Sequence, residues 1–195
     1  MGKYHKPREE QRIFAFFDIK QSTHIAENLS PIQFHKLLYE FFNDISLCIL
    51  ITKGEIYRYV GDEIVVTWQM KDGIKHSNCI RLFFYMKQQL DELSEKYVKL
   101  FGFKPDFHAA YHCGKVIRGE LGDIKSQFVY HGEVLFLGHK MEKACSYLGC
   151  DLIISSALAS DLPIPPEYVM KPIGKLLNFH KELLYTMEEK QPVMA

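Results

Sequence analysis

The chain has 195 residues, of which 47% are hydrophobic and 25% charged, and its 24 Lys and Arg residues balance its 24 Asp and Glu residues. This length fits one ordinary domain with a proper core, and the composition is that of a soluble globular protein. A formal charge of zero provides no basic field for nucleic acid, and the apolar runs are too short to span a bilayer, so we expect neither a nucleic-acid partner nor membrane contact by the chain itself.

The hydrophobic pattern predicts alternating strands and helices between a polar leader or linker at 1–11 and a tail at 191–195. In chain order we expect a strand at 12–17, a helical segment from about Ser22 to Gly54, strands at 55–60 and 63–68, a helix at 74–100, strands at 104–114, 115–123 and 126–132, a helix at 133–149, a strand at 151–156, a short helix near 156–161, and a hairpin of 173–179 and 182–187. Ser30 followed by Pro31 predicts a capped helix start, and Gly61-Asp62 predicts a tight hairpin turn. This order predicts an α+β sandwich, a single domain at 12–190, with a mainly antiparallel sheet and helices on one face.

Two carboxylates are the first candidates for chemistry. Asp18 ends the first buried strand, where an uncompensated charge would be costly, and Asp62 lies in the hairpin turn. The first strand and this hairpin are neighbours in a split βαβ core, so we expect both acids at one sheet edge. A magnesium ion would relieve their repulsion while it binds phosphate oxygens. A helix cap at Asp18 and a type I′ turn at Asp62 are the alternatives, and the two acids together favour the metal site.

Four segments in this order resemble the class III nucleotidyl cyclase catalytic domain. They are FAFFDIKQST at 14–23, GEIYRYVGDEIVVTW at 54–68, HAAYHCGKVIRGELGD at 108–123 and VYHGEVLFLGHKMEKA at 129–144. The resemblance covers residues 12 to about 187 and implies a ferredoxin-like βαββαβ core in a homodimer with composite active sites. It also implies two Mg²⁺ or Mn²⁺ ions, held by Asp18, Asp62 and the backbone carbonyl of Ile19. The implied reaction converts an NTP to a 3′,5′-cyclic NMP and pyrophosphate.

The remaining site positions follow from the same resemblance. Phosphate binding falls on Gln21, Ser22, Thr23, His108 and Lys181, with Lys175 as a second candidate for the last position. The backbone N–H groups of the turn after Asp18 suit phosphates independently, because they lie at a helix N-terminus. The two base-specifying positions hold Arg58 and Val129, which match neither the adenylate nor the guanylate cyclase pair.

The transition-state positions also depart from the family pattern. Phe136 stands where the family has Asn, and Lys140 stands where it has Arg, which keeps the charge but loses the forked donor. Losing one good transition-state donor costs about 3 kcal/mol, or about 10²–10³ in rate. We therefore expect slow turnover or an unusual choice of base. If the rate is normal, substitute donors are needed, and the nearest in sequence are Arg118, Lys125 and His139.

Two classes of function stay open. The first is a cytoplasmic, homodimeric nucleotidyl cyclase in second-messenger signalling, with a pyrimidine cyclase of anti-phage defence left open by Arg58 and Val129. The second is a degenerate cyclase-fold module that binds metal and nucleotide, or that forms a heterodimer with an intact partner chain. Five scattered cysteines without a CxxC pair are typical of reduced thiols in a cytoplasmic protein. The leader resembles the linker of membrane-anchored cyclases, so a longer, membrane-tethered protein is the alternative to a stand-alone domain.

Overall fold

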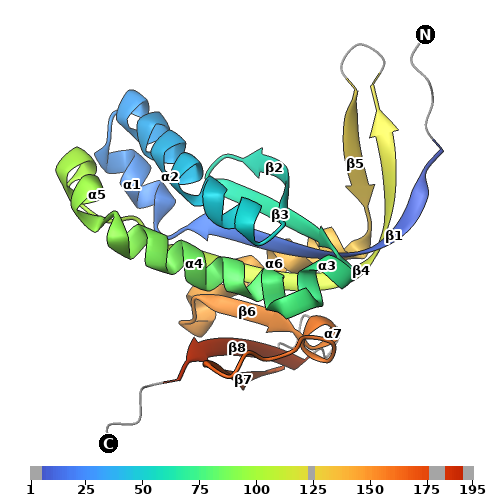
Figure 1. The fold of residues 1–195 in the computed structure, drawn as a ribbon. Coiled ribbons are helices and arrows are strands. Elements are labelled where there is room, and N and C mark those ends of the chain that lie inside the picture. Colours follow the sequence, from blue (N-terminus) through green and yellow to red (C-terminus); the bar gives the residue numbers. More distant parts are fainter. Residues whose placement is uncertain (1–5, 123–125, 176–182, 191–195) are drawn as a thin grey trace, which may run out of the picture.

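The structure is a computed structural model that describes residues 6–122, 126–175 and 183–190. Its described strands form one sheet in the order β2-β3-β1-β4-β6-β8-β7, with β5 paired to β4 (Figure 1). The strands are β1 Arg8–Ile19, β2 Glu55–Val60, β3 Glu63–Gln69, β4 Phe107–Leu121, β5 Gln127–His131, β6 Leu152–Ser155, β7 Tyr168–Lys175 and β8 Leu183–Glu189. The helices are α1 Ser22–Asn28, α2 Pro31–Ile51, α3 Met70–Ile74, a 3₁₀ turn Lys75–Ser77, α4 Asn78–Glu92, α5 Ser94–Phe101, α6 Glu133–Leu148 and α7 Ser156–Ala159. The predicted α+β class with a mainly antiparallel sheet is confirmed, since β4–β6 is the parallel pair among the described strands.

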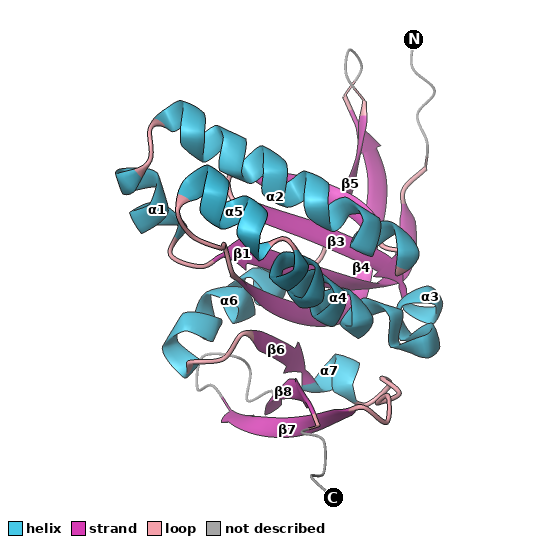
Figure 2. Ribbon diagram, turned by 60° about the vertical axis from the view of Figure 1, so that its left-hand side comes forward, coloured by secondary structure: helices cyan, strands magenta, loops and turns pink. Residues whose placement is uncertain are grey.

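Strand β1 is apolar on both faces, and both faces are covered. Ile13, Ala15 and Phe17 pack into the larger core with α2 and α4, whereas Phe14 and Phe16 belong to a second cluster with Val134 of α6. The views agree that α2, α4 and α5 lie on one side of the sheet and α6 on the other (Figures 1 and 2). The prediction of helices on one face is therefore wrong, because a strand with five consecutive buried apolar residues at 13–17 needs cover on both sides.

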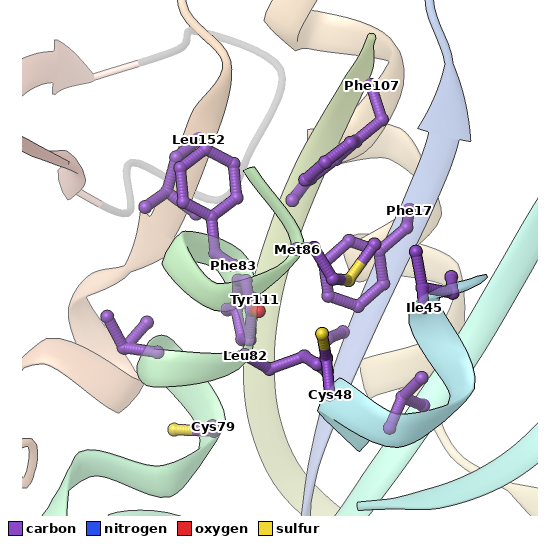
Figure 3. Close-up of a cluster of buried hydrophobic side chains, with 14 of the residues drawn as sticks. Phe17, Ile45, Cys48, Cys79, Leu82, Phe83, Met86, Phe107, Tyr111 and Leu152 are labelled. Carbon is purple, nitrogen blue, oxygen red and sulfur yellow. The ribbon is translucent and has the colours of Figure 1, made fainter. Parts of the chain in front are cut away.

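The larger core lies between the sheet and helices α2 and α4. Figure 3 shows Phe17 and Tyr111 from the sheet beside Cys48 of α2 and Met86 of α4. The ring of Phe17 meets that of Tyr111 edge-on, with their centroids 5.8 Å apart. These contacts anchor the C-terminal half of β1, which leads directly to Asp18.

Two predicted strand boundaries are wrong. The strands expected at 104–114 and 115–123 are one continuous strand, β4, in which Gly114 pairs with Arg12. Strand β1 starts at Arg8, so residues 8–11, expected in the leader, pair with residues 115–118 of β4. The cause is shared, because each strand offers the other a long run of ladder partners and this pairing overrides a local break signal at glycine.

The predicted cap of α2 is confirmed, whereas the two long predicted helical segments are each divided into shorter helices. Ser30 caps α2 in a capping box with Gln33, with Pro31 at the first helical position, and the segment from Ser22 to Asn28 is a separate helix. The long helix expected at 74–100 is divided into shorter pieces, partly because His76 and Ser77 adopt left-handed backbone angles before α4 begins. The C-terminal hairpin is present as β7 and β8, with its first strand beginning at Tyr168 rather than 173. Residues 176–182, between these strands, lie outside the described part.

Helix α6 packs very closely on β1. A Cβ atom built at Gly138 would overlap the ring of Phe16, so only glycine fits here without movement of the core. This contact fixes the height of α6 above the strand that ends at Asp18.

Gly138→Ala should therefore lower the free energy of unfolding by about 1–3 kcal/mol through overpacking. The sign is informative, because Ala in place of Gly inside a helix normally stabilises by about 1 kcal/mol. Urea denaturation measures the difference. Gly119→Ala is the control, since a Cβ there meets open space, and it should change the free energy by less than about 0.5 kcal/mol. Equal effects at the two positions would contradict the close-packing argument.

Candidate functional site

Strand pairing brings Asp18 and Asp62 together. Asp18 is the penultimate residue of β1 and pairs with Glu63, the first residue of β3, so the turn that carries Asp62 lies beside it. Gly61 supplies the left-handed backbone of that turn, with φ of 63°. The two carboxyl groups lie close enough that a hydrogen bond to Asp62 contributes to the pKa of Asp18. This edge of the sheet is where the sequence predicts the two acids to meet.

The carboxylate pair is poorly neutralised. The side chain of Asp18 is 15% exposed. Burial raises the pKa of Asp18, a hydrogen bond from Lys143 lowers it, and Asp62 raises it again, so that the pKa is about 6. The Asp62 Oδ2 atom is buried and has no hydrogen-bond partner among the described residues. An orphaned carboxylate oxygen beside a second carboxylate fits a hard divalent cation such as Mg²⁺ or Mn²⁺. Ile19, whose carbonyl follows Asp18 directly, has its side chain buried in the core.

Helix α6 adds a cation and a third carboxylate to this edge. Lys143 Nζ lies 2.8 Å from Asp18 Oδ2 and 3.0 Å from Glu142 Oε2. The side chain of Glu142 is buried, and burial together with the charge of Asp18 raises its pKa to about 7. Sequence reasoning missed both residues. One signal was available, because Glu142 lies among the buried positions of α6 beside Met141 and Cys145, where a charged residue is costly unless compensated.

A fourth carboxylate faces α6 from the sheet. Glu63 is almost completely buried, and its Oε2 atom lies 2.9 Å from Nδ1 of His139, whose side chain is half exposed. His139 was expected only as a substitute donor, and Glu63 was not identified. Asp18, Asp62, Glu63 and Glu142 therefore gather where β1, β3 and α6 meet.

Three of the phosphate-binding candidates follow β1 closely, one in the turn after Ile19 and two at the start of α1. Ser22 and Thr23 open α1, and Gln21 before them has a left-handed backbone with φ of 56°. His108, a residue of β4, pairs with Asp18 of β1. Burial, and then the charge of Lys20, lower the pKa of His108, which favours the neutral imidazole.

The two C-terminal phosphate candidates and the substitute donor Lys125 have no described contact with this site. Lys175 is the last residue of β7. Lys181 and Lys125 lie outside the described residues.

The base-specifying candidates line one groove and differ in their distance from the carboxylates. Arg58 pairs with Val65, which pairs with Phe16 two residues before Asp18, whereas Val129 is remote. Arg58 and Val129 share a cavity of about 390 Å³ with Tyr57, Arg118 and other residues of β2 and β5. Val129 pairs with Gly119, next to the pairing of Arg118 with Arg8 at the start of β1. Asp18 lies at the other end of that strand, so roughly 33 Å of extended chain separates the Val129 end from the metal candidates.

The transition-state candidates contact each other on the exposed surface of α6. Lys140 Nζ lies 4.0 Å from the centroid of the Phe136 ring, a cation–π geometry. The Phe136 side chain is 60% exposed, which is unusual for a large apolar ring. The exposure leaves both side chains available to another molecule.

Comparisons with known proteins agree with one another. The family model described as "Adenylate and Guanylate cyclase catalytic domain" matches residues 4–152. Adenylate cyclase 2 of Rhizobium meliloti (strain 1021) is 31% identical over 168 residues, which cover 86% of this chain and 46% of that protein. An adenylate cyclase of Anabaena cylindrica is 23% identical, with 82% of this chain and 32% of that protein covered. The chain thus spans less than half the length of the curated relatives it matches.

Solved structures share the fold. A bacterial light-regulated adenylyl cyclase superimposes with a TM-score of 0.80 at 19% identity, covering 97% of this chain and 55% of that one. The adenylyl cyclase CyaB from P. aeruginosa superimposes with a TM-score of 0.76 at 18% identity, covering 98% of this chain and all of that chain. Among the described residues, no helix is long and apolar enough to cross a membrane.

The raised pKa of Asp18 predicts that its charge destabilises the metal-free fold. The folded pKa of about 6 exceeds the ordinary value of 3.8. The resulting loss in the free energy of unfolding is absent below pH ~4 and complete above pH ~7, where it reaches about 1–3 kcal/mol. Asp18→Asn should therefore increase the free energy of unfolding near pH ~8 and lose that gain near pH ~4. Urea denaturation across this range, with a chelator present, measures it.

Asp106→Asn is the control of opposite sign. Burial alone would raise the pKa of Asp106, but hydrogen bonds from Lys20 and Lys87 outweigh it and hold the pKa at about 2. Its charge stabilises the fold above pH ~4 and ceases to do so as the pH falls through ~2, so the Asn variant should be less stable than wild type at neutral pH. Destabilisation of both variants at neutral pH would contradict the assignment for Asp18.

Proposed function

Because this chain belongs to the adenylate and guanylate cyclase catalytic domain family, we propose that it converts a nucleoside triphosphate to a 3′,5′-cyclic monophosphate and pyrophosphate. The observation that carries the proposal is the Asp18–Asp62 pair, whose Asp62 Oδ2 atom is buried without a hydrogen-bond partner among the described residues. Such an oxygen is costly to leave unpaired and suits a cation that also binds triphosphate. A cytoplasmic site and a role in second-messenger signalling are part of the proposal.

In this mechanism Asp18, Asp62 and the carbonyl of Ile19 would hold two Mg²⁺ or Mn²⁺ ions. When bound, the ions supply a lowered pKa for the ribose 3′-hydroxyl and neutralise charge on the triphosphate. The 3′-hydroxyl gives up its proton to water and its oxygen attacks the α-phosphorus, the bond from that phosphorus to the bridging oxygen breaks, and pyrophosphate leaves. Ser22 and Thr23 would present backbone N–H groups to the phosphates from the first turn of α1, which begins three residues after Ile19. His108, across the strand from Asp18, and Lys181 are proposed as further phosphate ligands.

A second copy of the chain would complete the site. Val129 lies at the far end of β1 from Asp18, so one chain cannot apply both to the same nucleotide. A twofold dimer would bring Arg58, Val129 and Lys140 of one copy to the carboxylates of the other, an arrangement typical of isologous interfaces. A heterodimer with a chain that supplies better donors is the alternative assembly.

The contact between Lys140 and Phe136 favours slow chemistry. An ammonium that lies over an aromatic ring is a weaker phosphate donor than a free guanidinium fork, and a phenyl ring cannot orient a ribose hydroxyl. The same observation supports a second candidate function, a nucleotide-binding regulatory module. The remaining alternative is a pyrimidine cyclase of anti-phage defence, which Arg58 and Val129 leave open because they match neither purine-specific pair.

Incubation with each of the four NTPs and Mn²⁺, followed by mass spectrometry, tests the proposal. We expect a cyclic product from at least one NTP with the wild-type chain and none with Asp18→Asn or Asp62→Asn. Calorimetry should show that both variants lose Mn²⁺-dependent nucleotide binding while circular dichroism shows an intact fold. Binding without product from any NTP would identify the regulatory module. Unchanged metal–nucleotide affinity in both variants would mean that the carboxylate pair is not the metal site.

The departures at Phe136 and Lys140 give a second test. Phe136→Asn combined with Lys140→Arg should raise the rate constant by about 10² or more with little change in nucleotide affinity, because the restored groups act on the transition state. Single-turnover measurements with bound nucleotide separate the two quantities. Lys171→Arg is a matched control, since Lys171 pairs with Glu188 on the terminal hairpin. No gain in the double variant with nucleotide bound would place the deficiency at Arg58 and Val129 instead.

A further inference from the structure

We propose that Glu63, His139 and Glu142 form a binding site for a borderline transition-metal ion, of the class of Zn²⁺ or Co²⁺, distinct from the Asp18–Asp62 pair. One ligand atom from each of the three residues lies within 4.8 Å of the other two. The inference needs only this cluster and does not depend on cyclase activity.

Rigid elements position the three side chains. Glu63 is the first residue of β3, and His139 and Glu142 are separated by nearly one turn on α6, so both project from neighbouring parts of the helix surface. The overlap that any side chain at Gly138 would have with Phe16 shows how closely this part of α6 approaches the sheet. A site shared by a helix and a strand is more precise than one built on loops.

One buried carboxylate oxygen in this cluster has an ion-pair partner but no hydrogen bond. Glu142 is 1% exposed, and its Oε2 atom accepts no hydrogen bond in good geometry from any described group, although Lys143 Nζ lies 3.0 Å away. Lys143 therefore gives this oxygen a charge contact without a hydrogen bond, and a metal ion would supply the bond that the buried oxygen lacks. Glu63 is 4% exposed and has His139 as its side-chain contact. One oxygen of Glu142 lies within 4.8 Å of the ligand atoms of Glu63 and His139, so the three side chains meet at one place.

The donor set selects the class of ion. One imidazole nitrogen with two carboxylate oxygens suits Zn²⁺, Co²⁺ and their neighbours, whereas Mg²⁺ prefers oxygen alone. Metal–ligand distances of about 2.0–2.2 Å require the three atoms to draw in from their present spacing. His139 can make this adjustment because its side chain is 51% exposed, and that exposure also provides the entry path.

The excess of negative charge around Lys143 also favours a bound metal ion at this cluster. Four carboxylates, from Asp18, Asp62, Glu63 and Glu142, gather around Lys143, the ammonium that contacts two of them. Two ions at the Asp pair would leave Glu63 in contact with His139 and Glu142 in contact with Lys143, with no metal ion at either carboxylate. A further cation at this cluster compensates charges that the Asp pair site does not reach.

Titration of the full chain with Co²⁺ alone tests the proposal by visible absorption and calorimetry. The background carries Asp18→Asn and Asp62→Asn, which removes the candidate catalytic ligands and makes the result independent of nucleotide chemistry. We expect one Co²⁺ per chain, displaced by Zn²⁺, without thiolate charge-transfer absorption. In the same background His139→Gln and the isosteric Glu142→Gln should each weaken binding by at least about tenfold. His24→Gln, at an exposed histidine of α1 that contacts Asn28, is the matched control and should leave the affinity unchanged.

Three results would overturn the site. The first is absence of Co²⁺ binding in the doubly substituted background. The second is unchanged affinity in both His139→Gln and Glu142→Gln, with folding verified by circular dichroism. The third is thiolate absorption on binding, which would assign the ion to cysteines. Because none of these measurements uses an NTP, a protein that binds Co²⁺ here but makes no cyclic product would support this inference while contradicting the proposed function.

Discussion

The contact between Gly138 and Phe16 is the constraint on which the rest of the site depends. Helix α6 contributes Lys143 to Asp18, Glu142 to the buried charge cluster and His139 to Glu63. None of these contacts would form if the helix stood farther from β1, as a larger residue at position 138 would require. The missing side chain thus lets a helix and a central strand, far apart in sequence, share one electrostatic environment. Packing on the apolar faces sets the distance, and the polar contacts follow from it.

The charge cluster works against the stability of the metal-free fold. Burial holds the pKa of Asp18 near 6 and that of Glu142 near 7, so each carboxylate ionises at a cost when the protein is at neutral pH. The two hydrophobic cores on either side of β1 offset that cost, because their burial is independent of pH. A cation that binds among these carboxylates removes the repulsion between them, so part of the free energy lost in the empty site is regained on binding. The arrangement therefore links metal affinity directly to the folding equilibrium.

The sequence was sufficient for the parts of this structure that depend on local signals. Asp18 and Asp62 were predictable because a strand end and a Gly-Asp turn are local features, and their meeting follows from neighbouring strands. The continuity of β4 was not, since Gly114 signals a break that only pairing with Arg12 overrides. Lys143 and Glu142 were missed for a related reason. Their role is set by the separation between α6 and β1, and no periodicity in one segment encodes the distance to another.

The central position of β1 also governs the order in which the chain can be assembled. Asp18 pairs with Glu63 on one side and with His108 on the other, so the second edge of β1 closes only after about 90 further residues have been made. Until β4 arrives, a nascent chain carries a buried-type strand, Ile13–Phe17, with an open hydrogen-bonding edge, and the apolar face that α6 covers stays bare until residues 133–148 have also been made. Such a strand is prone to pair with other chains. The architecture that brings the carboxylates to one sheet edge thus makes biosynthesis, rather than the finished fold, the stage at which this protein is most exposed to aggregation.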